Sequence, residues 1–143
     1  MAHRDWIDLL EAFGPLTAVV VALIVGVTQL WLQKKQLSQE LFDKRYVVYR
    51  AIQEFILRVV AAKGKLNRES VDAFRLSTAH SEFLFRRDVM DFIEEVLGRS
   101  ADLLILEMNT DDPEVAESYK ALMAWMETAV DVQNKVFRPY LHL

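Results

Sequence analysis

The sequence predicts an all-α protein in which an N-terminal transmembrane helix continues into a cytosolic, antiparallel four-helix bundle. Three observations support this fold class. Residues 12–33 form a stretch of 22 residues without a formal charge. Apolar residues then recur at steps of three and four along most of the chain, which is the spacing of one helix face. Only four Gly and three Pro occur in 143 residues, so few turns are available for strands and hairpins.

The charge-free stretch is long enough to cross a hydrocarbon core of about 30 Å as one helix. Trp31 lies near its end, and Lys34 and Lys35 follow it, an aromatic and then a basic collar that is typical of a helix leaving the bilayer. A secretory signal peptide would need a positively charged start and a small-residue cleavage site, and we find neither. We assign residues 15–33 to a transmembrane helix and, from the excess of Lys and Arg after it, place the C-terminal part in the cytoplasm. A buried helix of a soluble protein is the alternative.

Residues 1–14 mix large apolar side chains with acidic ones, which predicts a short helix lying in the membrane interface. Gly14 and Pro15 follow, and a proline is tolerated in the first turn of a helix. We therefore expect the spanning helix to start near Pro15, with a kink relative to the preceding segment. Beyond the membrane no helix breaker occurs before Gly64, so the same helix is expected to continue to Ala62.

Residues 34–143 are predicted to form one helical domain around a shared core. After the first helix, we expect helices over residues 68–85, over residues 88–108 with Asp88 as the N-cap, and over residues 113–138 with Pro113 in the first turn. The expected core residues are Leu41, Val48, Ile52, Phe55, Ile56, Val59, Val71, Phe74, Thr78, Ser81, Phe85, Val89, Phe92, Ile93, Val96, Leu97, Leu104, Met108, Val115, Tyr119, Leu122, Met126, Val130 and Phe137.

Charge is distributed unevenly along this domain. Residues 34–87 contain twelve Lys and Arg against six Asp and Glu, whereas residues 88–143 contain four against twelve. The basic half is suited to anionic lipid head groups or to a nucleic acid. The alternative is that the opposite charges pair between helices or subunits. The basic residues expected at the membrane surface are Lys34, Lys35, Lys44 and Arg45.

Small residues repeat along the transmembrane helix at four-residue steps: Gly14, Ala18, Ala22 and Gly26. Because the hydrophobic effect does not drive helix pairing in lipid, such a stripe favours close helix packing and therefore a homo-oligomer. The alternative is that Ala and Gly are simply common in membrane helices. One helix per chain cannot enclose a pore, so a channel would need a ring of subunits. The residues considered for its lining are Thr17, Val21, Ile24, Thr28 and Gln29, a mostly apolar set closer to a hydrophobic gate than to a selectivity filter.

The sequence offers little for enzyme chemistry. The chain has no cysteine, its three histidines are scattered, and it contains neither a Gly-rich phosphate loop nor a Glu-x-x-His metal pattern. We therefore expect no metal, no cofactor and no catalytic activity. Arg75 and His80 are the weak exceptions, but residues five apart on an ideal helix lie about 140° apart. For His80 we favour a partly buried structural role over a catalytic one.

The segment Arg75-Leu-Ser-Thr-Ala-His80 resembles the R-x(4–6)-H signature of HEPN domains, although Leu76 stands where that family has a polar residue. In that family the Arg and His of paired domains form a composite ribonuclease site. The wider layout is similar to HEPN-like transmembrane accessory proteins of type VI-B CRISPR systems. The stretches that carry this likeness are the single membrane helix with its basic exit, residues 41–49, Phe83-Leu84-Phe85 before Asp88, and the closing Pro139-Tyr140-Leu141.

This resemblance implies a ring-shaped pore in the bacterial inner membrane, with the N-terminus outside, that strengthens antiviral defence. It implies an RNA-guided nuclease or RNA as a partner and assigns Arg75 and His80 to a divergent HEPN motif. Three hypotheses follow: a self-assembling pore or membrane-perturbing ring, a membrane-tethered ribonuclease, and a passive anchor or adaptor for a cytosolic partner.

Overall fold

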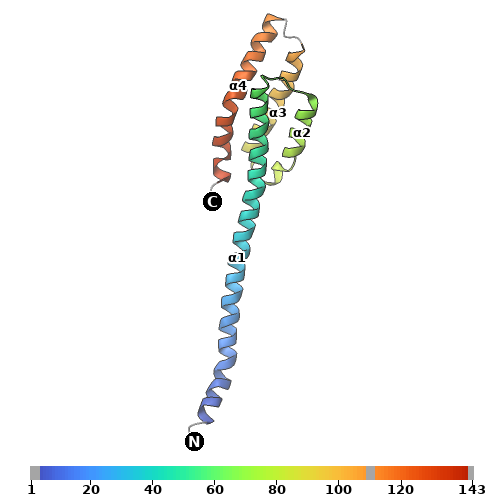
Figure 1. Cartoon of the computed structure of the whole chain (residues 1–143). Coiled ribbons are helices and arrows are strands. Elements are labelled where there is room, and N and C mark those ends of the chain that lie inside the picture. Colours follow the sequence, from blue (N-terminus) through green and yellow to red (C-terminus); the bar gives the residue numbers. More distant parts are fainter. Residues whose placement is uncertain (1–3, 109–111, 142–143) are drawn as a thin grey trace. The chain divides into compact units, whose positions relative to one another are not determined.

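The computed structural model describes residues 4–108 and 112–141, and it describes side chains from residue 15 onward. The chain divides into two compact units, which we call the N-terminal unit (Met1–Glu40) and the C-terminal unit (Leu41–Leu143). The elements are α1 (Arg4–Ala61), α2 (Arg68–Thr78), the 3-10 helix η1 (Ser81–Phe83), α3 (Arg87–Glu107), α4 (Pro113–Phe137) and the 3-10 helix η2 (Arg138–Tyr140) (Figure 1). The described residues contain no strand. The predictions of an all-helical chain and of a long apolar N-terminal helix are therefore confirmed.

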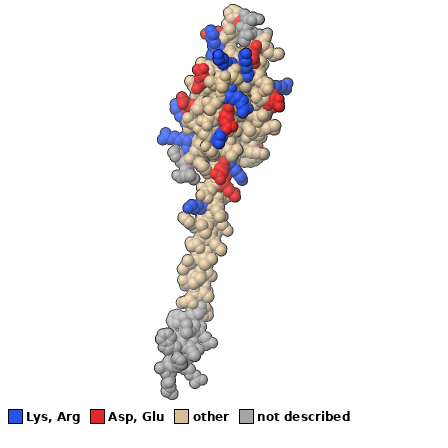
Figure 2. All heavy atoms as spheres, viewed as in Figure 1, with Lys and Arg blue, Asp and Glu red and all other residues tan. Residues whose placement is uncertain are grey.

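The first helix begins earlier than expected. It starts at Arg4 and contains Pro15, so residues 4–14 and the predicted spanning segment belong to one helix. A proline removes one backbone hydrogen bond, and here that loss does not end the helix. Within the described part of the chain, α1 is the one helix long and apolar enough to cross a membrane, and none of its apolar window is buried. Residues 15–33 accordingly form an uninterrupted uncharged surface (Figure 2).

The C-terminal end of α1 is closed by two residues with positive φ, Lys63 (51°) and Gly64 (76°). The Gly64 amide donates to the Val59 carbonyl at 2.9 Å, and the Lys63 amide donates to the Val60 carbonyl at 3.0 Å. This is the double hydrogen-bond pattern of a Schellman motif. The Tyr119 hydroxyl of α4 then donates to the Lys63 carbonyl at 2.7 Å. The end of α1 is thereby fixed both by its own backbone and by α4.

The helix expected over residues 68–85 is shorter than predicted. The Asn67 side chain caps its start by accepting from the Ser70 amide at 2.9 Å. At its end, the Thr78 hydroxyl donates to the Phe74 carbonyl at 3.0 Å and the Ser81 hydroxyl donates to the Thr78 carbonyl at 2.6 Å. Such side-chain hydrogen bonds offer the backbone an alternative to the helix. The helix stops at Thr78, and η1 follows.

Asp88 is not the N-cap of the third helix. The cap residue is Arg86, which makes no side-chain capping bond, and α3 begins at Arg87. One oxygen of the Asp88 carboxylate accepts instead from the Val89 amide at 2.9 Å and from the Tyr140 hydroxyl at 2.7 Å. The Asp88 side chain, which the local sequence pattern assigned to capping α3, therefore binds Tyr140 instead.

The fourth helix matches its sequence signals. Asp112 is the N-cap and accepts from the Glu114 amide at 2.9 Å, and Pro113 occupies the first turn. A proline fits there because the first turn needs no amide donor within the helix. The helix ends at Phe137, one residue before the predicted end, and η2 follows.

One core is shared by the helices of the C-terminal unit. Two predicted members are wrong: Leu41 is 36% exposed and Met108 is 84% exposed. Leu41 is the first residue of the unit, and Met108 is the C-cap of α3, so each lies where the packed segment ends. Leu103 is fully buried, whereas the predicted Leu104 is half-buried. The buried hydrophobic residues are Val48, Ile52, Phe55, Ile56, Val59, Val71, Phe74, Phe85, Val89, Phe92, Ile93, Val96, Leu103, Met126, Ala129 and Phe137.

Aromatic rings connect the elements of this unit in a continuous series, which we call the aromatic chain. Tyr49 of α1 lies edge-on to Phe137 of α4, with ring centroids 5.5 Å apart. Phe137 contacts Phe85 at 5.0 Å, and Phe85 contacts Tyr140 of η2 at 5.2 Å, again in edge-on geometry. Edge-on aromatic pairs stabilise a core beyond the area that they bury. The aromatic chain thus links α1, α4, the segment before α3 and η2.

Candidate functional site: a groove on α1

One face of α1 in the N-terminal unit is hollowed into a shallow groove. Its lining residues are Thr17, Ala18, Val21, Ala22, Val25, Gly26 and Gln29. They form two neighbouring rows with four-residue spacing, and the row from Ala18 to Gly26 contains only small residues. Rows at this spacing are the ridges and grooves by which helices pack against one another. The groove therefore combines a row of small residues with a row of larger ones on one face of α1.

Gly26 has room for a side chain that it lacks. A Cβ placed on Gly26 would meet no atom within 4 Å in the described structure. Glycine in a helix interior is less favourable than alanine by about 1 kcal/mol. The chain's own packing thus gives no reason for a glycine at this position, whereas close approach of a second helix would.

The polar residues of this helix differ in how their hydrogen bonds are satisfied. The Thr28 hydroxyl donates to its own helix, to the Ile24 and Val25 carbonyls, both at 2.9 Å. The Thr28 hydroxyl is therefore satisfied within its own helix. The Gln29 amide makes no hydrogen bond with any residue that the structure describes. A primary amide in a bilayer gains from a partner on another helix, because water is scarce there.

The groove combines residues that the sequence had divided between two roles. Ala18, Ala22 and Gly26, expected to pack helices, line it together with Thr17, Val21 and Gln29, expected to line a pore. Ile24 and Thr28 do not line it. A helix packed in the groove would therefore cover three of the five proposed pore-lining residues. Gly14 lies outside the residues whose side chains are described.

The four basic residues expected near the membrane surface are not equivalent. Lys34, Lys35 and Lys44 are exposed. The Lys35 ammonium lies over the Trp31 ring, 5.5 Å from its centroid. Arg45 is half-buried, and its Nε donates to the Leu84 carbonyl at 3.1 Å. Arg45 therefore has a packing role that its position in the sequence did not indicate.

Arg45 belongs to a cavity of about 530 Å³, which we call the Arg45 cavity. Its lining residues are Arg45, Phe83, Leu84, Phe85, Arg86, Asp88, Pro139 and Tyr140. The Arg45 guanidinium lies over the Tyr140 ring, 5.4 Å from its centroid, and the Tyr140 hydroxyl donates to Asp88 at 2.7 Å. Three stretches that were singled out separately in the sequence, residues 41–49, 83–85 and 139–141, thus meet at one place.

Two tyrosines of the C-terminal unit have perturbed acidity. The pKa of Tyr140 is raised, first because burial disfavours the phenolate and next because its hydroxyl donates to Asp88, although Arg86 opposes the shift. The pKa of Tyr119 is raised by burial and then by the negative charge of Glu107. Both hydroxyls therefore remain protonated donors at neutral pH.

The proposed dyad of Arg75 and His80 is not assembled within one chain. Arg75 lies in the last turn of α2, and His80 is the cap residue before η1. Both side chains are exposed, so the expectation of a partly buried His80 is wrong. Where the chain is described, no hydrogen bond or ion pair joins the two, and no group of three or more His, Asp or Glu side chains could hold a metal ion.

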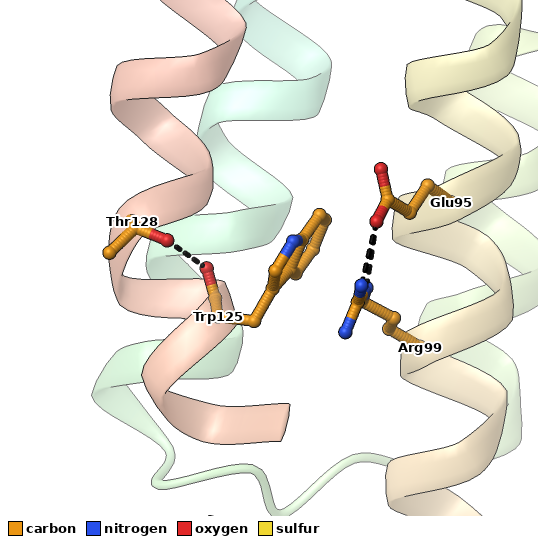
Figure 3. Close-up of polar contacts among 4 residues, drawn as sticks. All are labelled: Glu95, Arg99, Trp125 and Thr128. Carbon is orange, nitrogen blue, oxygen red and sulfur yellow. Dashed lines mark hydrogen bonds and ion pairs between the residues drawn. The ribbon is translucent and has the colours of Figure 1, made fainter. Parts of the chain in front are cut away.

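One contact between α3 and α4 was missed by the sequence reading. The Arg99 guanidinium donates twice to one oxygen of Glu95, at 2.8 and 3.0 Å, and lies 4.3 Å from the centroid of the Trp125 ring (Figure 3). The four-residue spacing of Glu95 and Arg99 could have indicated the ion pair. Nothing local could have indicated Trp125. The contact packs α3 against α4.

No protein-family model matches the chain, and comparison with curated proteins and with solved structures finds no match.

Proposed function

We propose that the chain is a self-assembling, single-pass membrane protein whose transmembrane helices associate through the α1 groove. The observation that carries this proposal is Gly26, a helix-interior glycine with open space at its Cβ position, in an exposed groove on the charge-free segment of α1. In lipid, helices associate by van der Waals packing over small residues and by hydrogen bonds between helices. The groove offers both.

Gln29 supports a second copy of the same chain as the partner. A primary amide contains both a donor and an acceptor, so two copies of Gln29 can bond to each other reciprocally. Isologous contacts of this kind are typical of homo-oligomers with two-fold symmetry. Larger rings would use the groove against a different face of the neighbouring helix.

The finer features of the proposal rest on the sequence. The basic residues after the membrane span favour a cytoplasmic C-terminal unit and an N-terminus outside, in the inner membrane of a bacterium. The resemblance favours a HEPN-like antiparallel four-helix bundle and an oligomer that acts as a pore or membrane-perturbing ring in CRISPR-associated antiviral defence. The exposed, unconnected Arg75 and His80 do not favour the ribonuclease alternative.

The proposal is tested by the mass of the full-length protein in detergent and in nanodiscs, for the wild type and for groove variants. Ala22→Leu and Gly26→Leu fill the groove and are expected to weaken association at least about tenfold, which corresponds to about 1.4 kcal/mol. Val20→Leu and Val27→Leu enlarge exposed residues that do not line the groove and are the matched controls. A wild-type monomer, or equal masses for groove and control variants, would overturn the proposal and favour a passive anchor.

Gly26→Ala separates packing between chains from helix propensity. Within a single chain the added methyl group meets no neighbour, so alanine should stabilise α1. If a second helix occupies the groove, the same methyl group weakens association. Gly98→Ala in α3 is the control, because Gly98 also has open space at its Cβ position. Thr28→Val removes a hydroxyl that is satisfied within its own helix, and it should leave the oligomer unchanged, whereas Gln29→Leu should weaken it.

The pore is tested separately, by leakage of a small dye from liposomes that contain the full-length protein. The wild type should release dye, and Gly26→Leu should release less if the pore requires the oligomer. An oligomer that releases no dye would remove the pore from the proposal and leave self-association intact.

A further inference from the structure

We propose that the Arg45 cavity binds a small anion with a phosphate group, supplied by a phospholipid head group or from solution. This inference concerns the C-terminal unit alone and does not depend on self-association through α1. Its basis is a cavity lined by two arginines, Arg45 and Arg86, the first already held in place, and by an exposed aromatic side chain.

The cavity has an excess of positive charge. Its lining includes two positively charged residues, Arg45 and Arg86, and one negatively charged residue, Asp88. Among the described residues no ion pair joins either arginine to an acid, whereas Arg50, Arg87 and Arg99 each pair with a carboxylate one turn away. The Asp88 oxygen that accepts from Tyr140 also accepts from a backbone amide. Two guanidinium groups in one cavity suit a phosphate, because each offers a planar set of donors to its oxygens.

Arg45 is preorganised for this role. Its Nε donates a hydrogen bond to the Leu84 carbonyl, and its guanidinium lies over the Tyr140 ring. Tyr140 is itself held by Asp88 and by edge-on contact with Phe85. The two contacts fix the arginine without using its terminal NH₂ groups, which remain to donate to an anion. A side chain fixed beforehand loses less entropy on binding.

The rim of the cavity is apolar and exposed. Phe83 is 78% exposed although it is a large hydrophobic side chain, and Pro139, which also lines the cavity, is exposed too. The cavity volume of about 530 Å³ exceeds what a lone phosphate needs and lies within the range for small-ligand sites. A phosphate with an apolar substituent therefore fits this cavity better than a bare ion.

The test uses the full-length protein in nanodiscs of pure phosphatidylcholine, with hydrogen exchange of the backbone amides in residues 83–90 and 138–141 as the readout. In one arm inorganic phosphate is titrated against chloride at equal ionic strength. In the other arm phosphatidylglycerol replaces a third of the lipid and no free phosphate is added. We expect slower exchange in these two segments in at least one arm. Protection in the lipid arm alone identifies the head group as the source, and protection in the phosphate arm identifies a soluble ligand.

Arg86→Gln is the decisive variant, because the Arg86 side chain is exposed and makes no capping bond, so the fold does not depend on it. It should weaken binding about tenfold or more, the effect of losing one hydrogen bond between charged groups. Arg68→Gln, at the start of α2, changes the net charge equally outside the cavity and should leave binding unchanged. The proposal is overturned if neither arm changes the exchange, if chloride protects as well as phosphate, or if Arg86→Gln and Arg68→Gln behave alike.

Discussion

Replacing Gln133 with Leu is expected to stabilise the C-terminal unit, although the substitution deletes a hydrogen bond. Gln133 of α4 is fully buried. Its Nε2 donates to the Tyr49 carbonyl of α1 at 2.6 Å, but its Oε1 has no hydrogen-bond partner in the described structure. The side chain therefore combines one satisfied polar group with one that is buried and unsatisfied.

The size of the effect follows from these two groups. The lost hydrogen bond contributes about 0.5 to 1.5 kcal/mol, whereas a buried polar group without a partner costs about 1 to 3 kcal/mol. The Tyr49 carbonyl lies inside α1 and keeps its acceptor role in the helix backbone after the substitution. Leucine is similar to glutamine in length and fills most of the same space. We therefore expect the free energy of unfolding to rise by about 1 kcal/mol.

The measurement is urea unfolding of the full-length protein in detergent, followed by the loss of helical circular dichroism. Gln133→Ala removes the same polar atoms but leaves a cavity, so it should be less stable than Gln133→Leu by about 2 to 4 kcal/mol. A Gln133→Leu variant less stable than the wild type by about 1 kcal/mol or more would refute the reasoning, because it would mean that the Gln133 amide contributes net stability.

Four further substitutions test other contacts. Gly64→Ala should lower the free energy of unfolding by about 2 to 4 kcal/mol, because a Cβ at φ 76° is strained and would overlap the Tyr119 hydroxyl, whereas Lys63→Gly should change it by less than about 1 kcal/mol in urea titrations. Folding raises the pKa values of Tyr119 and Tyr140, so these two hydroxyls ionise first in the unfolded chain, and their contribution to stability should be constant below about pH 9 and fall above pH 10. Tyr140→Phe should reduce that fall in alkaline unfolding curves, and an unchanged slope would contradict the assignment. Arg99→Lys, which weakens the cation–π contact with Trp125 and loses one donor to Glu95, should cost about 0.5 to 1 kcal/mol by thermal unfolding. No loss would show that the contact contributes nothing.

Local signals predicted the helices well where the decisive contacts are local. Asp112 and Pro113 begin α4 as their residue types indicate, because capping acts within one turn. Asp88 failed as a cap because Tyr140, 52 positions away, binds its carboxylate. The apolar spacing continued to Met108 although the packed surface ends before it. A periodic pattern shows which face is apolar, and it does not show where the neighbouring helices end.

The same distinction between local and long-range contacts holds for the candidate sites. The small residues of the α1 groove were visible because a four-residue repeat places them on one face. That Gln29 lies on the same face, and that Thr28 is satisfied within its own helix, required atomic positions. The Arg45 cavity was beyond sequence reasoning, since the contact of Arg45 with Leu84 joins residues 39 positions apart.

The aromatic chain limits how α1 can move within the C-terminal unit. Turning a helix by one residue rotates every side chain by 100°, which would carry Tyr49 away from Phe137 and withdraw Arg45 from Tyr140. Packed rings do not yield by small increments, so intermediate angles would leave voids that no neighbour fills. A twist of α1 about its own axis would therefore break the contact of Tyr49 with Phe137 and alter the Arg45 cavity at the same time.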